Sequence, residues 1–148
     1  MVIRSHGCRA YVFEFHNGTV SMGGLPFNKM SCTYEVLDKN TKSELHERQD
    51  LSLMLYATLI DSLQEYKSVV VDTRNRSDIE STVGYEVLIQ KGIVVTIRAR
   101  IINKSGSIIG FIGIDYTSSP TEETVMDAVH IIEDTAVKIG TLLSIEEG

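Results

Sequence analysis

The chain of 148 residues has the length of one ordinary domain, and its 43% apolar and 23% charged residues are typical of a globular protein. Its formal net charge of −6 argues against a general surface for nucleic acid or anionic membranes. No apolar run reaches the ~18 residues that span a bilayer, and no signal peptide is recognisable. We therefore expect one cytoplasmic domain over residues 1–148 that makes no membrane contact itself. The two cysteines, Cys8 and Cys32, match neither a disulfide framework nor a zinc-ligand spacing, so free thiols are expected.

The N-terminal third predicts three strands. Residues 9–16 alternate, with Tyr11, Phe13 and Phe15 on one face, which indicates a half-buried strand. The Asn17-Gly18 dipeptide that follows is a strong hairpin-turn signal, and residues 19–22 are predicted as the return strand. Residues 30–37 are predicted as the third strand, with one face formed by Met30, Cys32, Tyr34 and Val36.

A helix and a short strand are predicted next. Thr41 and Glu44 have capping-box spacing, which opens either a helix or a turn before one. A helix is then predicted from about Asp50 to Tyr66, because it carries an apolar stripe of Leu53, Tyr56, Ile60 and Leu63. Residues 69–71 are typical of a short buried strand.

The next segment predicts a helix followed by a hairpin. Ser77 and Glu80 form a second capping box, and Gly92 suits the left-handed position that ends a helix. Residues 93–102 form a β-branched strand, and residues 103–107 turn it into another strand over 108–116. Gly110 and Gly113 in that strand predict close approach of a packed helix or another backbone.

The last predicted helix has Ser119 as its cap, Pro120 at its first position and Glu122 completing the capping box. Its apolar residues form a heptad seam of Val125, Val129, Ile132, Ala136, Ile139 and Leu143. Such a seam packs on the sheet or pairs with a second copy of the chain.

The order of these elements resembles that of a GAF domain, a small ligand-sensing module. The matching stretches are VVVDTRNRSD (69–78), GIVVTIRARIINKSGSIIGFIGIDY (92–116) and the closing helix, while FHNG (15–18) and KMSCTYE (29–35) resemble small GAF-like proteins of bacteria and phages. The resemblance implies a GAF/PAS-like α+β fold, with a single mostly antiparallel sheet of about six strands flanked by helices and a pocket over one sheet face. GAF domains usually begin with a helix. Only residues 1–8 precede the first strand here, so either that helix is lost or the chain is a trimmed domain.

Three polar clusters are candidates for lining that pocket. The first is His16 and Asn17, which contact a ligand or simply build the turn. The second alternates onto one face of the third strand, which is either wet or part of the pocket: Lys29, Ser31, Thr33 and Glu35. The third lies before a predicted helix N-terminus, where free N–H groups and guanidinium groups favour an anion: Asp72, Arg74, Arg76 and Ser77. Its alternative is a pair of solvated arginines bonded to Asp72 or Asp78.

Thr96, Arg98 and Arg100 share one face of the strand over 93–102, and we interpret these charges as edge protection, with pocket lining as the alternative. No catalytic residue, metal site or cofactor is predicted. Bilin attachment of the phytochrome type needs a cysteine in the later pocket loops, where none occurs.

We therefore predict a small-molecule-binding sensory domain with an anionic or nucleotide-like ligand, cyclic nucleotides included, that signals through a homodimer of its terminal helix. A ligand-free dimerisation or protein-interaction module is the main alternative, and a thiol-dependent enzyme is the third.

Overall fold

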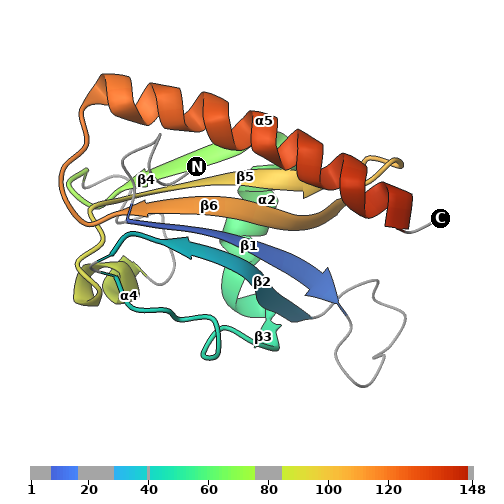
Figure 1. The fold of residues 1–148 in the computed structure, drawn as a ribbon, viewed down its shortest axis with the longest axis horizontal. Helices are drawn as coiled ribbons and strands as arrows, with labels where there is room; N and C mark the ends of the chain where they lie inside the picture. Colours follow the sequence, from blue (N-terminus) through green and yellow to red (C-terminus); the bar gives the residue numbers. More distant parts are fainter. Residues whose placement is uncertain (1–7, 17–28, 40, 76–84, 147–148) are drawn as a thin grey trace.

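The computed structural model describes residues 8–16, 29–39, 41–75 and 85–146, which build a single antiparallel sheet flanked by helices (Figure 1). The sheet has six strands in the order β3-β2-β1-β6-β5-β4. In chain order the strands are β1 (Arg9–His16), β2 (Lys29–Leu37), β3 (Leu51–Ser52), β4 (Ser68–Asp72), β5 (Val95–Ile102) and β6 (Ile108–Tyr116). The predicted α+β class with about six strands is confirmed.

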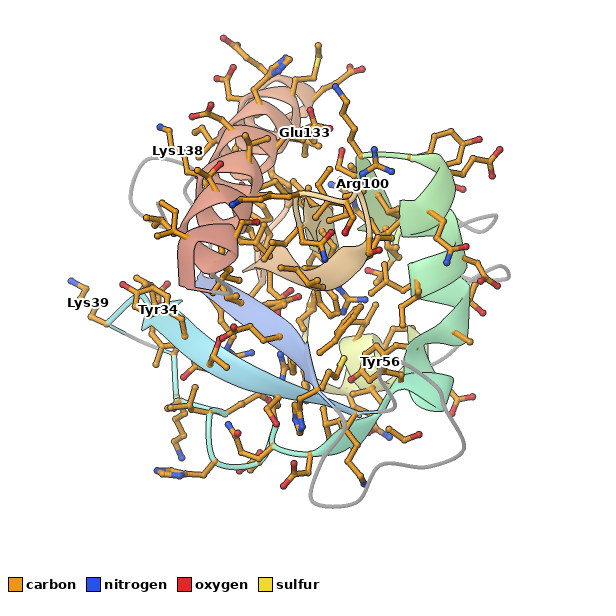
Figure 2. The ribbon with its side chains drawn as sticks, turned by 90° about the vertical axis from the view of Figure 1, so that its right-hand side faces the viewer. Tyr34, Lys39, Tyr56, Arg100, Glu133 and Lys138 are labelled. Atoms are coloured by element: carbon orange, nitrogen blue, oxygen red, sulfur yellow. The ribbon has the colours of Figure 1, made fainter. Side chains whose placement is uncertain are left out.

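Helices cover the two faces of this sheet in different ways. The long helix α5 (Glu122–Glu146) lies across one face, and α2 (Ala57–Glu65) lies on the other, preceded by the 3-10 turn η1 (Leu53–Tyr56) (Figures 1 and 2). The short helix α4 (Tyr85–Gln90) buries Leu88 against Val71 of the edge strand β4. None of the described helices is long and apolar enough to cross a membrane.

The two faces have different cores because side chains alternate along each strand. The α5 face is aliphatic, with Ile97, Ile101 and Ile114 against Ile132 of α5. The α2 face is aromatic and includes Phe13, Phe111 and Tyr11. Strand β1 therefore buries side chains on both faces, where the sequence predicted a half-buried strand, because it lies in the middle of the sheet.

A register shift opposite Val12 and Phe13 divides β2 into two parts. Phe13 pairs with Cys32 whereas Val12 pairs with Tyr34, so Thr33 is the extra residue of a β-bulge. The expectation that Met30, Cys32, Tyr34 and Val36 share one face was wrong for this reason. Met30 and Cys32 join the aromatic core, while Val36 packs against the aliphatic one and Tyr34 is 60% exposed.

The helix predicted from Asp50 starts seven residues later. Asp50 has a positive φ of 53°, which is incompatible with an α-helical start, and Leu51 and Ser52 pair with Met30 and Lys29 instead. The helix α2 begins only at Ala57. The capping-box residues Thr41 and Glu44 precede a turn over residues 45–47, which is the second of the two outcomes that the sequence left open.

The two predicted glycine turns that lie within the described residues are confirmed. Gly92 has φ +71° and ends α4, with Gly92 N donating to Ile89 O and Ile93 N to Leu88 O, which is a Schellman motif. Gly106, with φ +83°, closes the 103–107 turn. Residues 17–22 and the capping box of Ser77 and Glu80 lie outside the described residues.

The helix α5 begins at Glu122, two residues after the predicted start, and its cap is Thr121 instead of Ser119. Thr121 Oγ1 accepts a hydrogen bond from Thr124 N at 3.1 Å. The predicted seam faces the chain's own sheet: Ile132 and Ala136 are in the aliphatic core, with the other members packed against it, namely Val125, Val129, Ile139 and Leu143. The seam is thus occupied within the chain and is not a free dimer surface.

Close approach of another backbone is confirmed at Gly110 of β6, whereas Gly113 is approached by the Tyr11 side chain. A Cβ on Gly110 would overlap the carbonyl oxygen of Phe13 on the neighbouring strand, whereas Gly106 has open space around it.

We predict that Gly110→Ala lowers the free energy of unfolding by about 2 kcal/mol or more, through strain in the β1–β6 pairing. Gly106→Ala, which only strains a positive φ, should cost about 1 kcal/mol. Urea unfolding of both variants measures this, and equal losses would contradict the predicted β1–β6 contact.

Candidate functional site in the polar cluster opposite α5

A buried carboxylate organises the α2-facing side of the sheet. Asp115 on β6 is 1% exposed. Its Oδ1 accepts hydrogen bonds from Tyr11 Oη at 2.9 Å and from Thr96 Oγ1 at 2.8 Å. Arg9 Nη1 lies 3.7 Å from its Oδ2. Buried charge is tolerated when it is hydrogen-bonded and paired in this way.

Strand register brings these side chains together. Asp115 is opposite Arg9 on β1 and opposite Thr96 on β5. In the next row of the same face, Gly113 lies between Tyr11 and Arg98. A Cβ on Gly113 would be 2.5 Å from the Tyr11 ring, so the glycine gives that ring room to lie across β6.

Arg98 has spare capacity to bind an anion. Its Nε donates to Tyr11 Oη at 3.3 Å, and its guanidinium lies 5.9 Å from the centre of the Phe111 ring. Among the described residues no carboxylate lies within 4.0 Å of it. Although burial opposes its charge, the nearby Tyr11 and Asp115 raise the pKa of Arg98, so it remains a cation. Burial, with the charge of Asp115, raises the pKa of Tyr11, which remains a phenol that donates hydrogen bonds.

A second layer of charge surrounds Glu44, which follows β2 in the 41–50 loop. Its Oε2 lies 2.6 Å from Arg9 Nη1 and 2.8 Å from Arg48 Nη2, and its Oε1 lies 2.6 Å from Lys91 Nζ. Burial opposes ionisation of Glu44, but the hydrogen bond from Lys91 and the charges of Arg48 and Arg9 outweigh it and lower the pKa. Glu44 therefore ties the 41–50 loop both to β1 and to the end of α4.

Glu35 completes the group and orients the same loop. Its carboxylate accepts hydrogen bonds from Ser43 Oγ at 2.6 Å and from Glu44 N at 3.0 Å, and it lies 3.4 Å from Arg9 Nε. Arg48 also lies over the Tyr11 ring at 5.3 Å from its centre. We call these nine residues the polar cluster: Arg9, Tyr11, Glu35, Glu44, Arg48, Lys91, Thr96, Arg98 and Asp115.

The polar cluster differs in charge from the chain that contains it. Four cationic side chains face three carboxylates, which leaves a local excess of one positive charge in a chain of net charge −6. A cation without a carboxylate partner, beside a phenol donor and aromatic rings, suits recognition of an organic anion.

The structure separates the predicted ligand-binding residues. Glu35 belongs to the polar cluster. His16 and Ser31 meet at the other end of β1, where His16 Nε2 lies 2.8 Å from Ser31 Oγ, and Lys29 pairs there with His16. Thr33 is exposed at the bulge. The prediction that Lys29, Ser31, Thr33 and Glu35 form one face was wrong because the bulge reverses the alternation between Ser31 and Glu35.

Arg74, in the loop after β4, shows the second of the two outcomes proposed for the arginines of that loop. Arg74 Nε and Nη2 donate to the two oxygens of Asp72 at 2.8 and 2.7 Å, and the Arg74 side chain is 47% exposed. The hydrogen bond from Arg74 lowers the pKa of Asp72. Arg74 is thus already paired, while Asn17, Arg76 and Ser77 lie outside the described residues.

Sequence reasoning missed most of the polar cluster. It interpreted Thr96, Arg98 and Arg100 as protection of an edge strand, which was wrong because β5 lies between β6 and β4. The signal was present: a polar side chain at every second position of a strand whose other residues are all β-branched or small. The distant partners Arg9, Glu44 and Arg48 had no comparable signal, because their meeting depends on tertiary structure.

Thiol and metal chemistry find little support in the described residues. Cys8 and Cys32 are both buried, and burial raises the pKa of each thiol, which disfavours the reactive thiolate. In the part of the chain that the structure describes, no group of three or more His, Cys, Asp or Glu side chains is placed to hold a metal ion.

Comparison with known proteins identifies the fold. No protein-family model and no curated protein sequence matches the chain. Among solved structures, GAF3 from Slr1393 of Synechocystis sp. PCC6803 matches with a TM-score of 0.65 and 12% identity, over 99% of this chain and 90% of that one. The PixJ GAF domain of Thermosynechococcus elongatus matches with a TM-score of 0.63 and 8% identity, over 99% and 82% of the two chains. The phycocyanobilin-bound GAF domain of a cyanobacterial phytochrome matches with a TM-score of 0.60 and 16% identity, over 96% and 78%. The chain therefore is a GAF-like domain in fold.

The charge balance around Glu44 predicts a pH dependence of stability. Because the folded pKa of Glu44 is lowered, its ionised form stabilises the fold above the ordinary glutamate pKa of about 4.3, and this contribution is lost as pH falls through the lower folded pKa. We predict that Glu44→Gln lowers the free energy of unfolding at pH 7 by about 2 kcal/mol, because three cations lose their shared partner.

The free energy of unfolding of Glu44→Gln should then fall less between pH 6 and pH 3 than that of the unsubstituted chain. Chemical denaturation at several pH values measures both effects. Glu47→Gln, an exposed glutamate in the same loop, is the matched control and should change neither. An identical acid dependence in all three proteins would contradict the role given to Glu44.

Proposed function

We propose that this chain is a sensory domain that binds an organic anion over the sheet face carrying the polar cluster. The observation that carries the proposal is Arg98, a partly buried guanidinium that lies against Phe111 and has no carboxylate partner among the described residues. Removing a cation from water is costly unless an anion or several acceptors compensate it. A bound carboxylate or phosphate supplies that compensation through charge-assisted, bidentate hydrogen bonds.

The neighbourhood of Arg98 suits a nucleotide-like ligand. Tyr11 Oη is a second polar contact, and the guanidinium borders the buried aromatic core of Phe111 and Phe13, whose ring centres are 5.2 Å apart. A ligand with both a phosphate group and a planar ring matches a guanidinium beside aromatic side chains. Mononucleotides and cyclic nucleotides are therefore the first ligands to test.

The ligand is held without a covalent bond in this proposal. A solved structure of similar fold is described as phycocyanobilin-bound. Here both cysteines are buried, Cys8 beside β1 and Cys32 within β2, where Cys32 packs in the aromatic core. Free thiols are also what a reducing cytoplasm maintains.

Signalling is proposed to pass from the polar cluster to α5 through the sheet. Strands β5 and β6 carry Arg98 and Asp115 on one face, and they carry on the other face the isoleucines against which α5 packs. A ligand that binds Arg98 competes with the hydrogen bond from Arg98 to Tyr11. Because Tyr11 also donates to Asp115, a movement of Tyr11 changes a contact of β6. Because the predicted seam is occupied, a second copy would pair through the outer surface of α5, whose exposed apolar side chains are Met126, Val137, Leu142 and Ile145.

The dimer part of the proposal predicts a change in mass. Leu142→Glu, at a side chain that is 63% exposed on α5, should shift the chain from dimer to monomer at micromolar concentration. Ile89→Glu, at a 51% exposed residue of α4, is the matched control and should stay dimeric. Sedimentation equilibrium measures both, and a monomeric unsubstituted chain would remove the dimer from the proposal.

The ligand part is tested by native mass spectrometry of the purified chain, followed by a thermal-shift screen of nucleotides and cyclic dinucleotides. For any anion that stabilises the chain, Arg98→Gln should weaken binding at least tenfold, and Arg98→Lys should restore part of it because charge returns without the planar fork. Arg74→Gln tests the competing loop and should leave affinity unchanged, because Arg74 is already paired with Asp72. Unchanged affinity in a folded Arg98→Gln protein would contradict the assignment of Arg98 as the anion-binding residue.

A further inference from the structure

A separate cavity of about 290 Å³ lies on the opposite side of β5 from β6, where the edge strand stops. Strand β4 pairs with β5 only up to Ser68 opposite Ala99, so the last residues of β5 extend beyond it. The cavity occupies this gap between α5 and the chain leaving α2. Figure 2 shows Arg100 from β5 and Glu133 from α5 on this side of the molecule, and both line the cavity.

One side of the cavity is cationic. Arg100 is held in place because its Nη1 donates to Leu63 O at 3.1 Å and to Gln64 O at 3.3 Å, at the C-terminal end of α2. Lys67 lies beside it, with Lys67 O accepting from Arg100 N at 3.0 Å. Within the described residues, neither cation has a carboxylate within 4.0 Å.

The acidic residues of the lining already have partners. Glu133 Oε2 accepts a hydrogen bond from Ser68 Oγ at 2.5 Å, and Asp134 Oδ2 lies 3.0 Å from Lys138 Nζ. Because Ser68 is a neutral donor, the charges that remain without a counter-charge at the cavity are those of Lys67, Arg100 and Glu133, which leave an excess of one positive charge. This local excess is positive, in a chain whose net charge is −6.

The remaining wall is apolar and accessible. It is formed by Ile102, Ala136 and Val137, of which Ile102 is 39% and Val137 68% exposed, and His130 of α5 is the remaining lining residue. The volume is at the lower end of the range for small-molecule sites, roughly 300–1,000 Å³. A compact ligand fits such a space when it has one anionic end and one short apolar end.

We propose that this cavity binds a small organic monocarboxylate, with its carboxylate at Lys67 and Arg100 and its alkyl chain against Ile102 and Val137. This site is distinct from the polar cluster, because Arg98 does not line it. The two proposals can therefore be tested independently, and failure of one would not contradict the other.

Methyl NMR of the full chain tests the proposal, with sodium hexanoate as the probe. Hexanoate should shift the methyl signals of Ile102 and Val137 in a saturable way, while those of the aliphatic core residue Ile97 stay in place. Hexylamine has the same chain and the opposite charge, and it should bind at least tenfold more weakly. Equal shifts with both probes, or no saturable shift at Ile102 and Val137, would overturn the proposal.

Two charge reversals complete the test. Lys67→Glu should weaken hexanoate binding at least tenfold, because it turns a cationic wall anionic. Lys104→Glu makes the same charge change at an exposed residue of the 103–107 turn, outside the lining, and should leave binding unchanged. Equal affinity of the two variants would contradict the site. Arg98→Gln should keep its hexanoate affinity, and a parallel loss there would place the probe in the polar cluster instead.

Discussion

The carboxylate of Asp115 is the group on which the polar cluster of this sheet depends. It lies in the middle of a six-stranded sheet with 1% of its surface exposed, where water cannot compensate its charge. Tyr11 and Thr96 donate to it from the two neighbouring strands, and Arg9 adds positive charge. Arg9 in turn needs Glu44, and Glu44 recruits Arg48 and Lys91. One buried charge therefore sets a chain of pairings that reaches from the central strand to the 41–50 loop and to the end of α4.

Two glycines make this arrangement possible at a cost to the strand that carries them. A glycine inside a strand loses roughly 0.5–1 kcal/mol relative to alanine. In β6 that cost is offset, because Gly110 admits the Phe13 backbone and Gly113 admits the Tyr11 ring. On the opposite face the isoleucines of β5 and β6 pack against α5, where Gly140 admits the carbonyl group of Ile102. The two faces therefore differ in that the α2 face combines an aromatic core with the polar cluster, whereas the α5 face has an aliphatic core.

The sequence predicted the order and type of most elements, because hydrophobic periodicity and glycine turns are local signals. Gly92 and the 103–107 turn were located correctly for that reason. The errors arose where distant contacts decide. The bulge at Thr33 is imposed by pairing with β1, and residues 51–52 became a strand because β2 offers them a partner. Periodicity also could not tell whether the α5 seam meets a sheet or a second chain, since both present an apolar surface.

The candidate site was harder to predict because its partners are far apart in the sequence, as with Tyr11 and Asp115. The alternation along β5 nevertheless contained usable information. In a strand with neighbours on both sides and helices over both faces, polar side chains do not face open water, so each needs a partner. Thr96 finds Asp115, and Arg100 finds the carbonyl groups at the end of α2. Arg98 finds only a phenol and an aromatic ring. Once the strand order is known, the same alternation that was first interpreted as edge protection therefore identifies Arg98 as the residue on this strand whose guanidinium has neither a carboxylate nor a carbonyl partner among the described residues.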